Sequence, residues 1–237
     1  MNKKLTIIVP VYNEVNTVEI IIKKLLDLEL YNNIDKEIII IDDLSTDGSR
    51  EIIKSYDSKY DLIKGIYKDK NKGKGDSQKI AKQFVTGDYV IIQDADVEYD
   101  PEDINKLLKI AVDEGKDFVI GYRKLHLKMK TSIKHPYFYF REMAVDALTL
   151  TMNLLYNVKI EDCACCYRLF DINIWKSIEG KADKFEYDFS IICQVLKKTK
   201  NIGQCEVFYK SRTYDEGKKC TWDVGIHAFK RIILDRF

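Results

Sequence analysis

Residues 88–96 read DYVIIQDAD, an apolar run that ends on two aspartates. The β-branched residues of the run are typical of a strand that is buried on both faces of a sheet. Asp94 and Asp96 follow, separated by one small residue. Sheets with such strands are mostly parallel, and their ligands bind beyond the carboxyl ends of the strands. The stretch therefore predicts a parallel sheet with an acidic site at one edge.

The same pattern repeats along the first half of the chain. Val18, Ile21 and Leu25 fall on one face of a helix, which is the 3.6-residue period. Alternating strands and helices indicate βαβ units with right-handed crossovers and helices on both faces of the sheet. We therefore expect an α/β fold with a mostly parallel central sheet. The predicted strands cover 5–12, 37–42, 62–67, 88–96 and 117–122, and the predicted helices cover 16–28, 48–57, 76–86 and 102–114.

Composition limits the classes of protein that fit. The 237 residues include 39 Lys and Arg against 38 Asp and Glu, so no global field favours nucleic acid. Six cysteines without a pairing rhythm indicate a reducing compartment, and the CxCC cluster at 163–166 is better explained by buried strand thiols than by half a zinc site. No targeting signal is visible, and polar residues interrupt the apolar stretch 143–158. We expect a cytoplasmic protein without a spanning helix.

Polar side chains follow four of the predicted strands. Because the carboxyl ends of parallel strands meet at one edge, these groups should lie together. A single aspartate there is most often a turn former or helix cap, but several carboxylates in one cleft repel one another and favour a cation. Hard oxygen ligands suit Mg²⁺ or Mn²⁺, with Glu98 as a third ligand. The groups are Tyr12, Asn13 and Glu14, then Asp42 and Asp43, then Asp94 and Asp96, and finally Tyr122 and Arg123.

A glycine-rich loop indicates a second ligand chemistry. Residues 71–81, NKGKGDSQKIA, place two glycines and two lysines before a predicted helix. The outward amide groups of a helix N-terminus bind anions such as phosphate. The spacing is not that of a P-loop, and taken alone the segment is better interpreted as a flexible loop.

Four motifs together resemble the signatures of family-2 inverting glycosyltransferases with the GT-A fold. They are PVYNE at 10–14, IDDLSTDGS at 41–49, NKGKGDS at 71–77 and QDADVEYDP at 93–101. GYR at 121–123, DCACCYRLF at 162–170, FEYDFSI at 185–191 and the segment 211–229 extend the similarity to the dolichyl- and polyprenyl-phosphate mannose or glucose synthases. Relatives more often carry Thr, Ser or Gly within the DCACCYRLF motif, so sugar or acceptor preference can differ.

The resemblance implies a single domain, 1–237, with a nucleotide-binding half at 1–122 and an acceptor-binding half at 123–237. It implies a UDP- or GDP-hexose donor and a metal, Mg²⁺ or Mn²⁺, held by Asp94, Asp96 and Glu98. Asp96, Arg123, Arg168 and Asp162 are the implied catalytic residues, the two arginines gripping a phosphate. The implied substrate-binding residues are Pro10, Tyr12 and Glu14 near the nucleoside, Asp42 or Asp43 at the base, Lys74 at the diphosphate, and Asp94, Glu186, Arg212 and Lys218.

The sequence indicates the acceptor less clearly than it indicates the donor. A hydroxyl acceptor requires a general base, for which Asp162, Glu186 and Asp188 are candidates, whereas a phosphate acceptor requires positive charge. The segment 122–142 is basic and then aromatic, which suits either an anionic membrane surface or an ordinary solvated helix pair. The resemblance favours a polyprenyl phosphate at the cytoplasmic membrane face, with peripheral membrane contact. The alternatives are a sugar hydroxyl in cell-surface glycan synthesis and a non-catalytic nucleotide-binding module.

Overall fold

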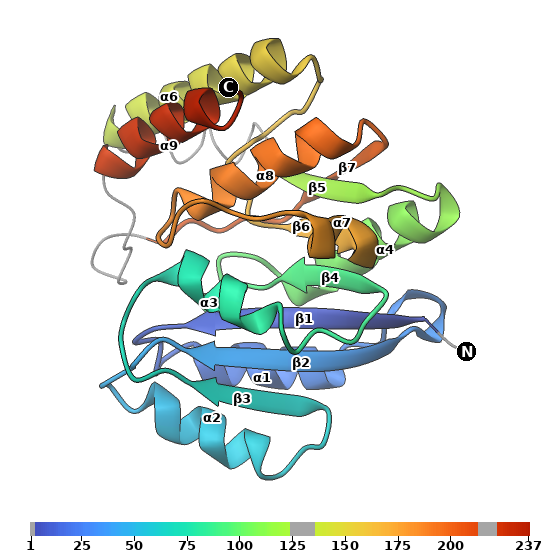
Figure 1. Ribbon diagram of the computed structural model, residues 1–237. Helices are drawn as coiled ribbons and strands as arrows, with labels where there is room; N and C mark the ends of the chain where they lie inside the picture. Colours follow the sequence, from blue (N-terminus) through green and yellow to red (C-terminus); the bar gives the residue numbers. More distant parts are fainter. Residues whose placement is uncertain (1–2, 124–135, 213–221) are drawn as a thin grey trace.

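The computed structural model describes residues 3–123, 136–212 and 222–237, with the backbone alone for 136–141 and 222–223. A seven-stranded sheet has the order β3-β2-β1-β4-β6-β5-β7 (Figure 1). The expected α/β architecture with a mostly parallel sheet is confirmed. The strands are β1 (Lys4–Val11), β2 (Asp35–Asp42), β3 (Ile63–Tyr67), β4 (Tyr89–Ile92), β5 (Phe118–Arg123), β6 (Arg168–Asp171) and β7 (Ile202–Val207).

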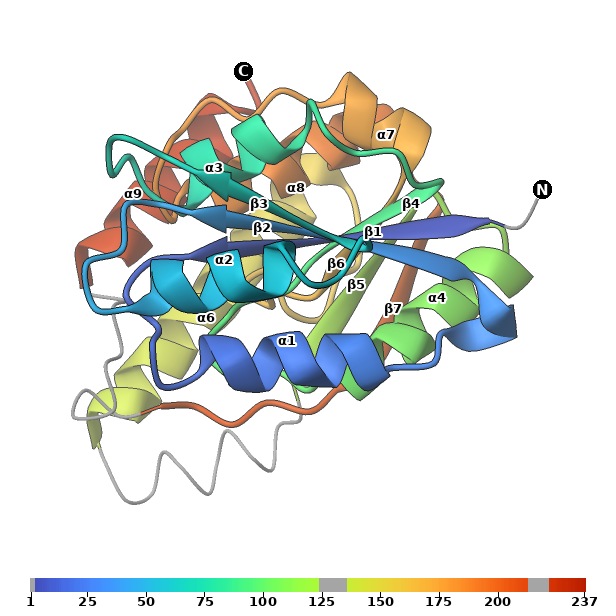
Figure 2. The ribbon, with the colours of Figure 1, turned by 90° about the horizontal axis from the view of Figure 1, so that it is seen from below.

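Helices cover both faces of this sheet. In Figure 2, α1, α2 and α4 lie on one face, and α3, α7 and α8 lie on the other. Helices α6 and α9 lie side by side and pack on α8 (Figure 1). The helices are α1 (Val18–Asp27), α2 (Ser49–Asp57), α3 (Lys74–Ala81), α4 (Ile104–Asp113), α6 (Pro136–Tyr156), α7 (Ile172–Ser177), α8 (Tyr187–Lys198) and α9 (Trp222–Leu234), with short 3-10 turns η1 (Tyr31–Asn33) and η2 (Pro101–Asp103).

Burial of the central strands explains why their sequences are so uniformly apolar. Ile7 and Ile8 of β1 are both fully buried, although they point to opposite faces of the sheet. Ile7 belongs to the core cluster that includes Ile21 of α1, and Ile8 belongs to the cluster that includes Ile192 of α8. Each face therefore has its own hydrophobic core, and the sheet separates the two.

Strand β6 is the one antiparallel member among the described strands. It pairs with β4 through Ile91 and Leu169 and with β5 through Val119 and Leu169. Since β6 runs against both neighbours, β5 stays parallel to β4, and the carboxyl ends of β1, β2, β4 and β5 share one edge. Cys163 and Cys165 are buried free thiols, as expected, but they lie in the turn before β6 rather than in a strand.

None of the helices within the described ranges is both long enough and apolar enough to cross a membrane. Helix α6 has 21 residues and so has the length. Its interior carries Asp146 and three further polar residues between 149 and 153, which lower its hydrophobicity.

Candidate active site

A cavity of about 760 Å³ opens at the shared carboxyl edge of the strands. Two sets of charged side chains line it among the described residues. The six carboxylates are Glu14, Asp43, Asp94, Asp96, Glu98 and Asp188. The six cationic side chains are Lys72, Lys74, Arg123, Arg168, Lys184 and Arg212. Because the two sets are equal in number and interleaved, the cavity can accept a cation and a polyanion together.

The acidic turn after β4, residues 94–98, is the centre of the cavity. Val97 has a φ of 54°, a left-handed conformation that is unusual for a β-branched residue and that marks functional sites. In this turn the backbone N–H of Glu98 donates to Asp96 Oδ1 at 3.2 Å. Burial, together with the charges of Asp94 and Glu98, raises the pKa of Asp96 to about 7. A bound cation would relieve this repulsion, so the carboxylates of the turn fit the predicted metal.

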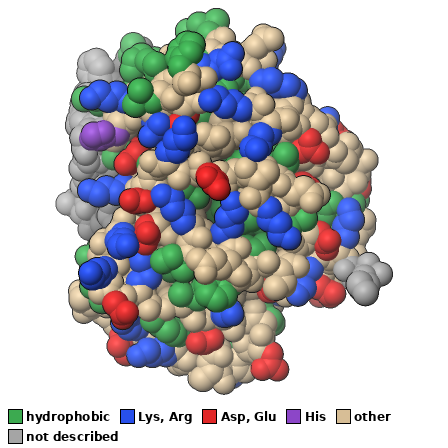
Figure 3. Space-filling model, viewed as in Figure 1, with side chains coloured by type: hydrophobic (Ala, Val, Ile, Leu, Met, Phe, Trp, Pro, Cys, Tyr) green, Lys and Arg blue, Asp and Glu red, His purple; other side chains and the backbone are tan. Residues whose placement is uncertain are grey.

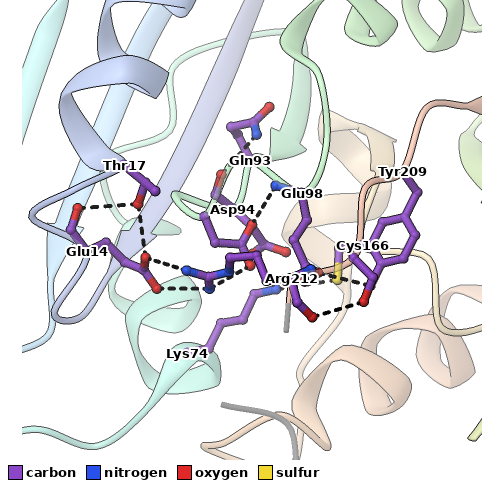
Figure 4. Close-up of polar contacts among 11 residues, drawn as sticks. Glu14, Thr17, Lys74, Gln93, Asp94, Glu98, Cys166, Tyr209 and Arg212 are labelled. Atoms are coloured by element: carbon purple, nitrogen blue, oxygen red, sulfur yellow. Dashed lines mark hydrogen bonds and ion pairs between the residues drawn. The ribbon is translucent and has the colours of Figure 1, made fainter. Parts of the chain in front are cut away.

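Protein groups contact each of these carboxylates, and for Asp94 and Asp96 the contacting group is a cation. Asp94 Oδ1 lies 2.5 Å from Lys74 Nζ, and Asp96 Oδ2 lies 3.1 Å from Arg212 Nη2. Glu98 accepts a hydrogen bond from the backbone N–H of Arg212 at 2.7 Å and another from Tyr209 Oη at 3.0 Å (Figure 4). Nowhere in the described chain do three His, Cys, Asp or Glu side chains stand together at metal-binding geometry. The predicted ligands are adjacent but do not converge on one point.

Lys74 is the first residue of α3 and reaches into the cavity (Figure 4). Its Nζ lies between Asp94 and Asp188, at 3.2 Å from the latter. Asp188 also lies 3.4 Å from Arg168 Nη1 and accepts a hydrogen bond from Gln78 at 3.1 Å. Burial alone would raise the pKa of Asp188, but Lys74 and Arg168 lower it overall. Asp188 is therefore a carboxylate held in its charged form, and a poor general base.

The loop before α3 is built by Asp43. Its carboxylate accepts hydrogen bonds from the backbone N–H groups of Lys72 at 3.1 Å and Gly73 at 2.7 Å, and it pairs with Lys68. Gly73 has a φ of 98°, which only glycine adopts easily. These contacts start the helix at Lys74, two residues earlier than the pattern predicted. Lys74 thus projects from a fixed helix end rather than from a flexible loop.

The two aspartates predicted at the base differ in position. Asp43 lines the cavity. Asp42 is fully buried, and its two oxygens accept from the Ser45 backbone N–H at 3.1 Å and from Arg50 at 2.5 Å. Asp42 is not among the described lining residues, so of the two only Asp43 can meet a ligand there. Pro10, Tyr12 and Glu14 also line the cavity. Their contact with a nucleoside stays a prediction.

Two other predicted groups form an internal ion pair. Arg123 donates to Asp162 from Nε at 2.6 Å and from Nη2 at 2.9 Å. Arg123 lines the cavity and stacks on Tyr209, with the guanidinium 5.0 Å from the ring centre. Asp162 is buried and lies outside the lining, so it orients Arg123 and does not face a substrate. This placement argues against Asp162 as a base.

Only two of the remaining predicted residues belong to the described lining of the cavity. Arg168 and Arg212 line the cavity. Glu186 precedes α8 and is absent from the described lining. Lys218 lies outside the described residues, as does most of the basic and aromatic segment 122–142.

Sequence reasoning missed the apolar wall of the cavity. This wall is formed by Ala144, Val145 and Leu148 of α6 together with Val224 and Gly225 of α9. The apolar stretch 143–158 was visible in the sequence, but its composition does not reveal that α6 and α9 extend over the edge of the sheet. The lining of the cavity therefore combines charged side chains with an apolar wall from α6 and α9.

Comparison with known proteins agrees with this geometry. Residues 6–176 match the family described as Glycosyl transferase family 2. The chain is 33% identical over 138 residues to a cholesterol galactosyltransferase of Borreliella burgdorferi, covering 56% of this chain and 37% of that protein. It is 33% identical over 127 residues to a dolichol-phosphate mannosyltransferase of Pyrococcus furiosus, covering 51% of this chain and 33% of that protein. The matches thus span about a third of the length of these relatives.

Solved structures share the fold over almost the whole chain. Glucosyl-3-phosphoglycerate synthase of Mycobacterium tuberculosis, crystallised with Mn²⁺, UDP and glucosyl-3-phosphoglycerate, superposes with a TM-score of 0.70 at 15% identity and covers 98% of this chain and 80% of its own. The same enzyme, crystallised with Mg²⁺ and UDP, superposes with a TM-score of 0.69 at 15% identity and covers 98% of this chain and 79% of its own. At such low identity these similarities establish the GT-A fold and nothing further.

Proposed function

Since the chain belongs to glycosyl transferase family 2, we propose that it transfers a hexose from a nucleotide diphosphate sugar to a polyprenyl phosphate, with inversion at the anomeric carbon. The observation that carries the proposal is the lining of the cavity, which combines charged side chains with an apolar wall from α6 and α9. A lipid phosphate has the same two parts. The residues 1–122 supply the nucleotide side and 123–237 most of the acceptor side.

The donor would bind at the carboxyl ends of β1, β2 and β4. Tyr12 and Asp43 line the cavity and would contact the nucleoside. Lys74 projects from the start of α3, where the positive end of the helix dipole also favours anions. This part of the cavity suits a uridine or guanosine diphosphate.

Asp94, Asp96 and Glu98 would hold a divalent cation, because their crowded carboxylates are hard oxygen ligands. Such an ion stabilises the negative charge that develops on a departing diphosphate. Lys74, which already lies within reach of Asp94, adds a second positive charge beside the same oxygens. The chain thus places its cations where the leaving group would form.

The acceptor side contains cations and lacks an available base among the described residues. Asp188 is held by Lys74 and Arg168, and Asp162 is held by Arg123. A phosphate oxygen is already anionic and needs no base to attack the sugar. Arg168 is 3% exposed and its Nε has no hydrogen-bond partner in the described part of the chain, so it would retain a donor for an anion in the cavity. These contacts favour a phosphate nucleophile over a hydroxyl.

An apolar outer surface continues from the apolar wall. Met143, Leu150 and Leu154 lie on one face of α6 and are 52%, 60% and 74% exposed. Ile226 and Phe229 of α9 are 66% and 46% exposed. Figure 3 shows hydrophobic side chains gathered at the top of the molecule, over α6 and α9. Exposed apolar side chains beside an acceptor cavity suit peripheral contact with a membrane that contains the lipid acceptor.

A transfer assay tests the proposed function. UDP- and GDP-hexoses are first screened by thermal shift with Mn²⁺, because a bound donor raises the melting temperature. The donor that binds is then incubated with phytanyl phosphate in detergent or with a soluble methyl hexoside. We expect label transfer to the lipid phosphate. Faster transfer to the sugar hydroxyl would indicate glycan synthesis instead, and donor binding without transfer to either acceptor would indicate a nucleotide-binding module.

A further inference from the structure

Arg212 brings a guanidinium to the acidic turn. Its Nη1 lies 2.9 Å from Glu14 Oε2, and its Nη2 lies 3.2 Å from Glu14 Oε1 (Figure 4). The same Nη2 lies 3.1 Å from Asp96 Oδ2. One side chain thus connects the end of β1 to the turn after β4. The side chain of Arg212 is only 14% exposed, so water screens these contacts weakly.

Backbone contacts hold Arg212 in this position. The N–H of Lys210 donates to the carbonyl of Glu98 at 2.9 Å, and Tyr99 forms a β-bridge with Tyr209. The N–H of Arg212 itself donates to the carboxylate of Glu98 at 2.7 Å. The segment 208–212 therefore packs along the acidic turn. These backbone contacts, and not charge alone, place the guanidinium beside Asp96.

We propose that Arg212 is the resident counter-ion of the acidic turn, and that a divalent cation binds by displacing its guanidinium from Asp96. The inference rests on the proposed function, because it takes Asp94, Asp96 and Glu98 as the metal ligands. Asp96 is crowded by Asp94 and Glu98, so it requires a positive partner when no metal is present. A metal at Asp96 and the guanidinium at 3.1 Å would repel each other, so the two exclude one another there.

This competition predicts an unusual effect of a mutation. Loss of a positively charged side chain from a cavity normally weakens the binding of anions. Here the loss of Arg212 should strengthen the binding of a cation, because the metal no longer has to displace the guanidinium. Arg212 is thus a positioning residue that keeps the carboxylates assembled and sets the affinity of the nucleotide-free protein for metal.

Manganese titration of the nucleotide-free protein tests the inference, with free Mn²⁺ followed by electron paramagnetic resonance. Arg212→Gln should bind Mn²⁺ roughly tenfold more tightly than wild type, the effect of losing one close like-charge contact. The matched control is Lys24→Gln. It also removes one positive charge, from an exposed pair 3.2 Å from Asp100, and should change the affinity less than about twofold.

The outcomes separate this inference from the proposed function. If wild type binds Mn²⁺ and Arg212→Gln binds it no more tightly, the displacement is wrong and the metal assignment stands. If neither protein binds Mn²⁺, the metal assignment fails as well. An NMR measurement on wild type tests the displacement even if the variant does not fold. The Nε–H of Arg212, which is buried and has no hydrogen-bond partner among the described residues, should shift in ¹⁵N NMR spectra on saturation with Mg²⁺ but not at equal ionic strength of NaCl. An unshifted signal would overturn the displacement.

Discussion

The guanidinium of Arg123 and the carboxylate of Asp162 form a buried, two-point ion pair, with contacts of 2.6 and 2.9 Å. Such paired geometry fixes the plane of the guanidinium. Asp162 therefore acts through Arg123, which lines the cavity, and does not itself reach a ligand. The pair turns a residue that looked like a candidate base into a support for Arg123 in the lining of the cavity.

Asp162→Asn should destabilise the protein, because it leaves the buried charge of Arg123 without its partner. Breaking one side of such a pair costs about 3–5 kcal/mol. Urea denaturation measures the loss. Asp113→Asn, which alters an exposed aspartate that accepts from Tyr31 Oη at 2.9 Å, is the control and should cost less than about 1 kcal/mol. Unchanged stability of Asp162→Asn, combined with a large loss of turnover, would return Asp162 to the role of base.

Asp96→Asn should abolish transfer while the fold persists, because it removes a hard anionic ligand and keeps the side-chain size. Circular dichroism tests whether the variant keeps its fold, and Mn²⁺ titration tests whether it has lost metal binding. Full turnover by the variant, or by wild type in excess chelator, would contradict the metal assignment.

The raised pKa of Asp96 also predicts a pH dependence of stability without metal. Its folded-state pKa is about 7 against an ordinary value of 3.8, so folding favours the protonated carboxyl. The stability that Asp96 contributes is present below pH 3.8 and is lost as the pH rises through 7. Asp96→Asn has no carboxyl that titrates here. The free energy of unfolding of the variant should therefore rise relative to that of wild type as the pH increases from about 4 to about 7. A difference in free energy of unfolding that stays constant across that pH range would contradict the raised pKa of Asp96.

Asp43 and Asp42 should differ in nucleotide binding. Asp43→Asn should weaken the binding of UDP or GDP by roughly tenfold without a metal, since it disturbs a group that faces the cavity and shapes the loop before α3. Asp42→Asn should lower stability through its lost pair with Arg50 but leave the affinity within about twofold. Isothermal titration calorimetry measures both affinities. Equal weakening by the two variants would show that Asp42 also reaches the base.

The exposed face of α6 should bind lipid. Leu150→Glu should weaken sedimentation with vesicles that contain anionic phospholipid, because a charge is inserted into the apolar face. Ile20→Glu is the matched control, since Ile20 of α1 is 48% exposed and lies on the other side of the sheet from α8. Equal loss by both variants, or none by either, would contradict contact through α6.

The parts of the fold that the sequence predicted are those with a local pattern. Uniformly apolar runs located β1, β2, β4 and β5, and the polar residues at their ends located the cavity. The antiparallel β6 and the wall from α6 and α9 depend on contacts between distant segments, which periodicity does not encode. The partners of Asp42, Asp162 and Asp188 were also hidden, because a carboxylate that binds a substrate and one that binds an arginine look alike in a sequence.

One comparison tests the central claim most directly, namely that the nucleophile is a phosphate that needs no base. The purified protein is given its donor with either a short-chain prenyl phosphate or the prenyl alcohol of the same length. The two acceptors share the apolar tail and differ only in the attacking group. We predict transfer to the phosphate, with an inverted anomeric carbon by NMR, and no detectable transfer to the alcohol. Transfer to the alcohol at an equal or higher rate would contradict the account.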